Sequence, residues 1–294
     1  YISNLKGINV QHLLSVDDMK ESYIFDLWSK AIDQKSNYSN ALKNKILTNL
    51  FYEPSTRTSS SFYSAMVRQG GSVIPINNVK FSSAIKGESL EDTVMTMATM
   101  SDCIVLRHPL TGSVAKAANV SQVPIINAGD GEGEHPTQTL LDGFTIFYNN
   151  NEKIDNLRIT MIGDLKNGRT VKSLVKFLSR YSGNHFNFVS PKELSFPKES
   201  LPKNSFETTK IDEVINETDV LYVTRVQTER GSDHQYSLSL EKLNLLPKKS
   251  IVMHPLPRVS EIPREFDNDP RAKYFDQMRY GLWCRMVLLK DIIV

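Results

Sequence analysis

The sequence is poor in cysteine, in charge of one sign and in long apolar runs. Its 294 residues include two cysteines, Cys103 and Cys284, which have no metal-ligand spacing and form no disulfide framework. We interpret both as reduced and buried, as expected in a reducing compartment such as the cytoplasm. The 35 basic and 33 acidic side chains leave a net charge of +2, which gives no support for nucleic-acid binding. No apolar run approaches the roughly 18–20 residues that span a bilayer, so we expect no membrane association.

Nucleotide-binding motifs are also missing. The turn Gly163–Thr170 lacks the GxGxxG spacing of dinucleotide sites and the Lys-Ser/Thr pair of a P-loop. We therefore expect no nucleotide cofactor, and no cluster of ligand residues indicates a metal. These absences weigh against a nucleotide-dependent oxidoreductase, which binding of labelled NAD would detect.

Short apolar runs alternate with helical patterns along the chain, and its length favours two domains. This alternation predicts an α/β fold with two domains, each a mainly parallel sheet with helices on both faces. A polar stretch at 149–152 divides the expected domains 1–148 and 149–278, and a helix at about 279–294 is expected to pack back on the first. The expected strands are Ile46–Phe51, Val73–Ile76, Cys103–Leu106, Val123–Ile126, Ile159–Ile162, Phe186–Val189, Val220–Val223 and Ile251–Met253, and the expected helices include Ser59–Arg68, Leu90–Met100 and Thr170–Ser182.

Ligands of such sheets bind beyond the carboxyl ends of the strands, so we expect the active site in the cleft between the domains. The first strand is followed by Ser55–Thr58, which brings hydroxyls and one guanidinium to a helix N-terminus. That end carries about half a positive charge and free N–H donors, and Arg57 adds a fork that matches phosphate. Ordinary N-capping is the alternative, but a cap needs one hydroxyl and does not need an arginine.

Further polar side chains follow the other strands. His135 and Gln138 are three residues apart and share a helix face, where both can address a carbonyl-bearing ligand. Arg169 and Arg225 follow two strands of the second half, and two arginines suit a ligand with two carboxylates. The alternatives are a structural histidine and ordinary salt bridges. In His254–Arg258, two prolines leave carbonyl oxygens unclaimed by regular structure.

Together these segments resemble the aspartate/ornithine carbamoyltransferase family along nearly the whole chain. The Ser-Thr-Arg-Thr and His-Pro-Xaa-Gln segments mark the wider family, whereas Arg-Val-Gln and His-Pro-Leu-Pro-Arg look like the aspartate branch. An ornithine enzyme is expected to carry His-Cys-Leu-Pro at the last position. The segments that carry the resemblance are Phe51–Thr58, Lys86–Glu88, Arg107–Pro109, His135–Gln138, Gly163–Leu165, Arg225–Gln227 and His254–Arg258.

The resemblance implies transfer of a carbamoyl group from carbamoyl phosphate to L-aspartate, an early step of de novo pyrimidine biosynthesis, without cofactor or metal. The implied catalytic residues are Arg57, Thr58, Lys86, Arg107 and His135. The implied carbamoyl phosphate site consists of Ser55, Thr56, Arg57, Thr58, Ser82, Lys86, Arg107, His135, Gln138, Leu256 and Pro257. The implied aspartate site consists of Lys86, Arg169, Arg225, Gln227 and Pro257.

The resemblance also implies a homotrimer in which Ser82 and Lys86 reach the site of the neighbouring subunit. Glu53 is implied to link the domains through Arg169 and Arg230, and a regulatory subunit or fused pathway enzymes are left open. Three stretches look shorter than in the family: 198–209, 230–236 and the segment after residue 286. The remaining alternatives are a carbamoyltransferase for another amino acid and a binding protein that kept the fold without catalysis.

Overall fold

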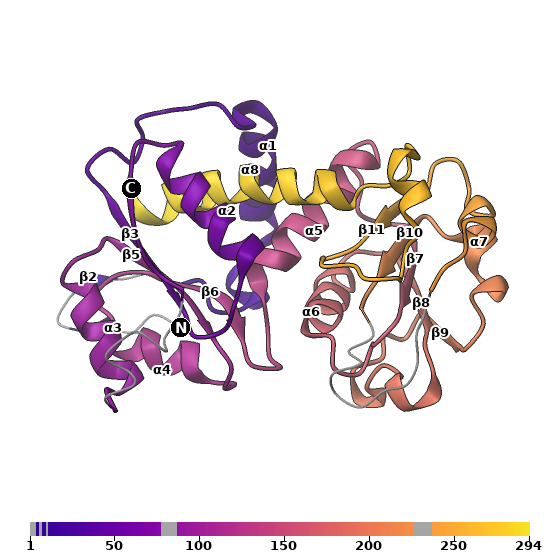
Figure 1. Ribbon diagram of the computed structural model, residues 1–294, viewed down its shortest axis with the longest axis horizontal. Coiled ribbons are helices and arrows are strands. Elements are labelled where there is room, and N and C mark those ends of the chain that lie inside the picture. Colours follow the sequence, from indigo (N-terminus) through magenta and orange to yellow (C-terminus); the bar gives the residue numbers. More distant parts are fainter. Residues whose placement is uncertain (1–3, 6–7, 10, 78–86, 226–236) are drawn as a thin grey trace. The chain divides into compact units, whose positions relative to one another are not determined.

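A computed structural model describes residues 4–5, 8–9, 11–77, 87–225 and 237–294 (Figure 1). The chain forms two compact units, and each is considered by itself. Unit 1 consists of Tyr1–Leu141 and Met278–Val294, and unit 2 of Asp142–Gln277. These divisions fall inside helices α5 (Pro136–Asn149) and α8 (Tyr274–Ile293), whereas the sequence placed the domain limits at 148/149 and 278/279. In the described ranges, no helix has the length and apolar character of a membrane span.

The sheet of unit 1 is parallel, with strand order β4-β3-β5-β6. All four predicted strands of this half are present, and β5 and β6 differ in their ends. The pairing of His108 with Asp130 extends both strands toward the carboxyl edge, and β6 begins after Pro124, which lacks an N–H. The strands are β3 (Ile46–Phe51), β4 (Ser72–Ile76), β5 (Cys103–His108) and β6 (Ile125–Asp130), and a short antiparallel pair, β1 (Asn4–Leu5) and β2 (Ile8–Asn9), precedes them.

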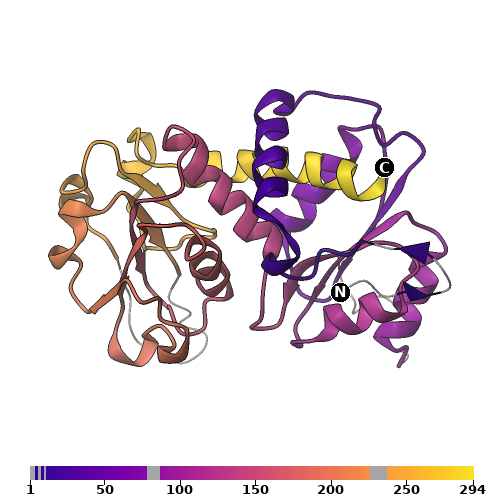
Figure 2. The same ribbon diagram turned by 180° about the vertical axis from the view of Figure 1, so that it is seen from behind.

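Helices cover both faces of this sheet (Figures 1 and 2). One face packs against α3 and α4, where Leu50 of β3 shares a buried apolar cluster with Val94 and Val114. The next residue toward the amino end, Asn49, points to the other face and donates to the carbonyl of Ser59 in α2, at 3.0 Å. The helices are α1 (Glu21–Gln34), α2 (Thr56–Val67), α3 (Leu90–Ala98) and α4 (Ser113–Val120), together with the unit 1 parts of α5 and α8.

The sheet of unit 2 is also parallel, with strand order β11-β10-β7-β8-β9. The four strands predicted for this half are confirmed, and β9 is an additional edge strand. The strands are β7 (Arg158–Ile162), β8 (His185–Val189), β9 (Ser205–Thr208), β10 (Val220–Val223) and β11 (Ile251–Met253).

The faces of this second sheet are covered by α6 (Arg169–Leu178) and α7 (Leu240–Asn244). Leu221, Val223 and Leu243 of α7 belong to one buried apolar cluster. Because side chains alternate along a strand, Tyr222 points to the opposite face. Short 3-10 helices lie at Val16–Asp18, Lys192–Leu194, Lys198–Ser200, Ile211–Glu213, Ile215–Glu217 and Arg264–Asn268.

Both sheets contain a topological switch point. In unit 1 the chain leaves β3 toward β4 on one side and continues with β5 on the other. In unit 2 it leaves β7 toward β8 and later returns to place β10 on the other side. Ligands of open α/β sheets bind at such points, beyond the carboxyl ends of the strands. The fold therefore predicts ligand-binding groups at the carboxyl ends of β3 and β5 in unit 1 and of β7 and β10 in unit 2.

Candidate active site

The end of β3 delivers Ser55 and Arg57 to the first turn of α2. Ser55 occupies the N-cap position with extended backbone (φ −150°, ψ 93°), and its side chain makes no capping hydrogen bond to the helix. The structure therefore does not support ordinary capping by this hydroxyl, the alternative weighed from sequence. Thr58, in the same turn, is 7% exposed. Hydroxyls and backbone N–H groups at the N-terminus of a helix of this length suit an anion.

Two guanidinium groups lie close together at this edge of unit 1. Arg107 is the Cα partner of Phe51 in the β3–β5 ladder, so it ends beside the Ser55–Thr58 turn. Desolvation, and then the positive charge of Arg107, lower the pKa of Arg57. Like charges repel, and a bound anion between them would relieve that repulsion. Among the described residues, Arg57 has no carboxylate within ion-pair distance.

Glu53 supplies one negative charge to this edge. Its Oε2 lies 2.9 Å from Nε of Arg107, and the side chains of Glu53 and Arg107 are 31% and 18% exposed. The Nε contact leaves the outer nitrogens of Arg107 for a ligand that approaches from the solvent side. The expected link from Glu53 to Arg169 and Arg230 stays a prediction, and Arg230 lies outside the described residues.

His135 and Gln138 lie beyond the carboxyl end of β6. Pro136 is the first residue of α5, the position where a proline fits a helix, and the carbonyl of His135 accepts from the N–H of Gln138 at 3.0 Å. His135 is 3% and Gln138 6% exposed. Nδ1 of His135 lies 3.4 Å from Oγ1 of Thr137, which leaves the tautomer to be set by its surroundings. Both side chains are therefore buried and do not extend into solvent.

In unit 2, Arg169 and Arg225 follow adjacent strands. β7 and β10 pair in parallel with Ile162 opposite Val223, so the turns after them meet at the same edge. Gly163 has φ +120°, and a Cβ there would lie 2.3 Å from the carbonyl oxygen of Thr224. Only glycine allows the two turns to approach this closely. Arg169 begins α6, and both arginines are partly exposed.

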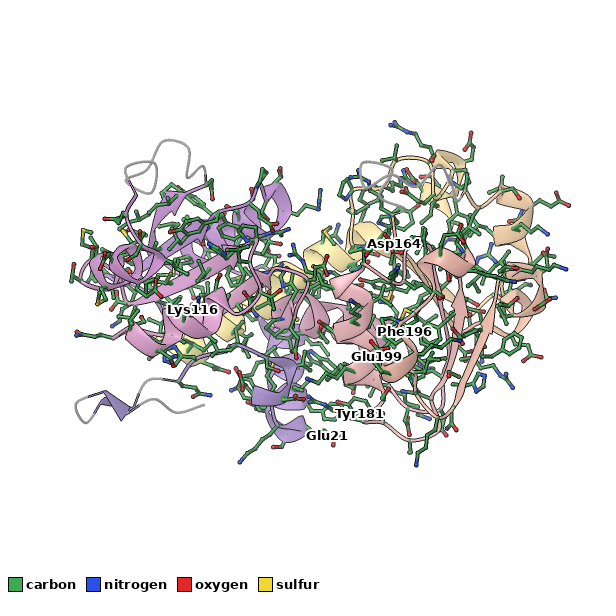
Figure 3. The ribbon with its side chains drawn as sticks, turned by 90° about the horizontal axis from the view of Figure 1, so that it is seen from below. Glu21, Lys116, Asp164, Tyr181, Phe196 and Glu199 are labelled. Carbon is green, nitrogen blue, oxygen red and sulfur yellow. The ribbon has the colours of Figure 1, made fainter. Side chains whose placement is uncertain are left out.

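The turn between Gly163 and Arg169 is organised by Asp164, which is 4% exposed (labelled in Figure 3). Its Oδ1 accepts from the backbone N–H of Asn167 at 3.0 Å, and its carboxylate also accepts from the side-chain amide of Asn167. These hydrogen bonds set the course of the backbone from Gly163 to Arg169. From sequence, Asp164 was included within the segment Gly163–Leu165 and was given no role, although aspartate is common in turns because its side chain hydrogen bonds to nearby backbone N–H groups.

Leu256 and Pro257 follow β11, which pairs with β10. Leu256 has φ +53°, its peptide bond to Pro257 is cis, and its N–H donates to Nδ1 of His254 at 2.8 Å. Arg258 of the same segment forms a bidentate ion pair with Asp267 and stacks over the ring of Tyr274 at 5.1 Å. Arg258 therefore fixes the segment within unit 2.

The structure thus groups the predicted residues into two sets. Ser55–Thr58 and Arg107 gather at the unit 1 switch point, with His135 and Gln138 beyond the adjacent strand. The ends of three neighbouring strands in unit 2 carry Arg169, Arg225 and the segment with Leu256 and Pro257. Ser82, Lys86 and Gln227 lie outside the described residues. No group of three or more potential metal-ligating His, Cys, Asp or Glu side chains occurs in the described ranges.

The fold and these two edges define a class: a two-domain α/β protein with anion-binding groups at the switch point of each sheet. Residues 11–147 match the family described as aspartate/ornithine carbamoyltransferase, carbamoyl-P binding domain, and residues 155–292 match its Asp/Orn binding domain. The chain belongs to the aspartate/ornithine carbamoyltransferase family.

Several relatives are similar over almost their whole length. The aspartate carbamoyltransferase catalytic subunit of Thermoplasma volcanium is 47% identical over 300 residues, covering 96% of this chain and 97% of the relative. The catalytic subunit of M. jannaschii aspartate transcarbamoylase superposes with a TM-score of 0.90 at 44% identity, covering 97% and 98% of the two chains. Aspartate transcarbamoylase from Trypanosoma cruzi in complex with N-(phosphonacetyl)-L-aspartic acid gives a TM-score of 0.90 at 40% identity, covering 100% and 97%.

Proposed function

We infer that this chain is an aspartate carbamoyltransferase, which transfers the carbamoyl group of carbamoyl phosphate to the amino group of L-aspartate. The products are N-carbamoyl-L-aspartate and phosphate, and the reaction is an early step of de novo pyrimidine biosynthesis. The observation that carries this inference is the pair of anion-binding edges, one in each unit. Arg57 at the N-terminus of α2 and Arg107 at the end of β5 suit a phosphate, and Arg169 and Arg225 suit a dicarboxylate.

The relatives support the same assignment. The Trypanosoma cruzi protein was solved with a ligand whose name joins a phosphonate to aspartate, so one molecule carries both kinds of anionic group. Binding of both substrates by this chain would therefore use Arg57 and Arg107 for the phosphate and Arg169 and Arg225 for the aspartate. The amide-bearing Gln138 and the carbonyls of Leu256 and Pro257 would address the carbamoyl amino group.

The reaction needs one bond made and one bond broken at the carbamoyl carbon. The aspartate amine, in its neutral form, attacks this carbon and gives a tetrahedral intermediate with a negative oxygen. The bond to the phosphate oxygen then breaks, phosphate leaves with the electron pair, and it is a suitable acceptor for the proton that the amine loses. Arg107, Thr58 and His135 are the groups proposed to stabilise the oxyanion.

Catalysis on this account is mainly orientation and charge stabilisation. Holding two anionic substrates in attack geometry supplies up to about 7–11 kcal/mol of the barrier in favourable cases. An oxyanion donor contributes about 2.7–4 kcal/mol. His135 acts in its neutral form as a hydrogen-bond donor and not as a base. No step requires a nucleophilic side chain of the protein.

The acceptor test separates the two branches of the family. Purified protein is incubated with carbamoyl phosphate and either L-aspartate or L-ornithine, and the carbamoylated products are quantified. We expect carbamoyl-aspartate with aspartate and no carbamoyl-ornithine, since Arg169 and Arg225 would face the ornithine ammonium. Carbamoyl-ornithine as the main product would refute the acceptor assignment, and binding of carbamoyl phosphate without either product would refute the enzymatic one.

We also propose a homotrimer whose active sites receive Ser82 and Lys86 from the neighbouring subunit. Subunits with Arg57→Ala are mixed with subunits with Lys86→Ala, and trimers are allowed to re-form. Random assembly gives about a quarter of the sites an intact Arg57 and an intact neighbouring Lys86. Activity that rises to about a quarter of wild type supports shared sites, whereas activity that stays at the mutant baseline after proven exchange contradicts them.

A further inference from the structure

A cluster of fully buried polar residues lies behind the strand ends of unit 2. Asp142, Tyr222, His254 and Gln277, here called the Asp142 cluster, are each 0% exposed. The hydroxyl of Tyr222 donates to Oδ2 of Asp142 at 2.7 Å, and Nε2 of Gln277 donates to Oδ1 at 2.6 Å. The backbone N–H of His254 donates to Oε1 of Gln277 at 3.1 Å. Four elements, α5, β10, α8 and the end of β11, meet through these contacts.

The direction of each hydrogen bond in the cluster is determined. The N–H of His254 can only donate, so Gln277 must present its carbonyl oxygen there and its amide nitrogen to Asp142. Asp142 therefore accepts with both carboxylate oxygens. Burial, and then the negative charge of Asp142, raise the pKa of Tyr222, which keeps its hydroxyl available as a donor. A buried polar network that is fully satisfied holds its members in one arrangement, because an unpaired member costs free energy.

Two chains of hydrogen bonds, here called branches, run from Asp142 to residues of the proposed aspartate site: one through Tyr222 and one through Gln277. The hydroxyl of Tyr222 is also hydrogen bonded to the side chain of Thr170, the residue after Arg169 in the first turn of α6. Tyr222 itself lies three residues before Arg225 on the same stretch of chain. The other branch passes from Gln277 to the backbone of His254.

His254 continues this second branch toward the site. Its Nδ1 accepts from the N–H of Leu256 at 2.8 Å, and Leu256 precedes Pro257, whose carbonyl is assigned to the substrate. One carboxylate thus connects the segments that follow β7, β10 and β11. These segments lie far apart in sequence, and the hydrogen bonds of Asp142 add a side-chain link to the strand pairing of β7, β10 and β11.

We propose that Asp142 is a positioning residue for the aspartate site: it sets the relative placement of Arg169, Arg225 and the Leu256–Pro257 carbonyls without touching the substrate. This inference rests on the proposed function. Loss of the carboxylate releases both branches at once. It should therefore weaken the binding of aspartate and leave the binding of phosphate at the Ser55–Thr58 turn, which belongs to unit 1, nearly unchanged.

The test compares Asp142→Ala and Asp142→Asn in the full-length protein. The asparagine oxygen can accept from Gln277, and its amide nitrogen can face the oxygen of Tyr222, whose proton then turns to Thr170. Asp142→Ala should raise the KM for aspartate about 10- to 100-fold, as expected when two buried donors lose their acceptor. Asp142→Asn should recover most of this loss. The Kd for inorganic phosphate should change by less than about twofold in both variants, because the phosphate-binding turn belongs to the other unit.

Asp219→Ala is the matched control in the same unit. The carboxylate of Asp219 accepts from the N–H of Arg158 at 2.8 Å, at the amino ends of β7 and β10, away from the strand ends that carry the site. Its loss should lower the melting temperature and leave the KM for aspartate unchanged. A purely structural role of Asp142 would give this same pattern, so an unchanged KM in Asp142→Ala would overturn the proposal.

If Asp142→Ala does not fold, variants that remove one of the two hydrogen bonds to Asp142 test the positioning role instead. Tyr222→Phe removes one hydroxyl and Gln277→Met removes the amide with little change in shape. Each should raise the KM for aspartate more than it changes the Kd for phosphate, and equal or absent effects on both would contradict the proposal. A wild-type protein that forms no carbamoyl-aspartate would refute the proposed function, whereas an active wild type with unaffected variants would refute the positioning role alone.

Discussion

Replacement of Arg57 by alanine tests the phosphate-binding turn directly. Arg57 is the second residue of α2, and its positive charge is repelled by that of Arg107. Arg68, the C-cap of the same helix, provides a matched control. Its guanidinium donates to the carbonyl of Ser36 at 2.8 Å and lies 4.8 Å from the ring of Tyr38, far along the helix from the switch point.

The size of the effect follows from the contact that is removed. Hydrogen bonds to charged groups contribute about 1.5–3 kcal/mol. Arg57 is exposed before the ligand binds, so solvent screening favours the lower part, about 1.5–2 kcal/mol. That range corresponds to a Kd for phosphate about 10- to 30-fold weaker than that of wild type. The bound anion relieves the repulsion between Arg57 and Arg107 in wild type, and the variant lacks this gain, which argues for the upper end of the 10- to 30-fold range.

Titration calorimetry with inorganic phosphate at low and high salt measures the change. Arg57→Ala should weaken binding by the stated factor, and Arg57→Lys should recover part of it, because lysine keeps the charge but loses the planar fork. Arg68→Ala should leave phosphate binding as in wild type even if the protein becomes less stable. Equal phosphate affinities in Arg57→Ala and wild type would refute the assignment of this turn as the phosphate site.

Two further predictions concern unit 2 and the response to pH. Gly163→Ala should raise the KM for aspartate by at least about tenfold and lower stability by about 1–3 kcal/mol, because the new Cβ would collide with Thr224. Gly112→Ala is the control: Gly112 also has a positive φ (+89°), but a Cβ there meets open space. This variant should be less stable than wild type and should have an unchanged KM for aspartate. Burial lowers the pKa of His12, whose Nδ1 accepts from the N–H of Ile125 at 3.1 Å. The unfolded chain therefore binds the proton more readily, and stability should be full above about pH 6.5 and fall below it. Denaturant unfolding between pH 5 and 8 should show this slope, and His12→Asn, which keeps an acceptor without the titration, should flatten it; an equal slope in the variant would contradict the assignment.

The strands were the most predictable part of the fold. Parallel strands buried on both faces are continuous apolar runs, and such runs located β3, β5, β7 and β10 within two residues at each end. Strand β9 was missed because it is an edge strand with one apolar residue, Phe206, which is 44% exposed. An edge strand of this kind has no pattern that separates it from a polar loop.

Helix α1 was missed for a different reason. Its N-cap, Lys20, provides no side-chain cap, and its C-cap, Lys35, has φ +47° where glycine is the usual signal. The helix is stabilised by tertiary contacts instead: Trp28 is fully buried, and its indole N–H donates to the carbonyl of Leu140 at 3.2 Å. A contact between residues so far apart in sequence is not visible in a local pattern.

The same distinction applies to the candidate site. Ser55–Thr58, Arg107 and Arg169 were predictable because they lie at the carboxyl ends of strands or in the first helical turn that follows, where the topology of parallel sheets collects ligand-binding groups. The Asp142 cluster was not predictable, because Asp142 meets Tyr222 and Gln277 across 80 and 135 positions of sequence. In the sequence Asp142 is one more polar residue in a helical pattern, and its role depends on the packing of four elements.

The proposed function requires that the arginines of unit 1 and those of unit 2 both take part in binding the substrates. It is tested most directly by the affinity of N-(phosphonacetyl)-L-aspartate for wild type, Arg57→Ala and Arg169→Ala, measured by titration calorimetry at one salt concentration. Because this ligand carries a phosphonate and an aspartate moiety in one molecule, both variants should bind it at least about tenfold more weakly than wild type, one lost charge-assisted contact each. Wild-type affinity in Arg169→Ala together with weakened binding in Arg57→Ala would contradict the claim, since the ligand would then engage unit 1 alone.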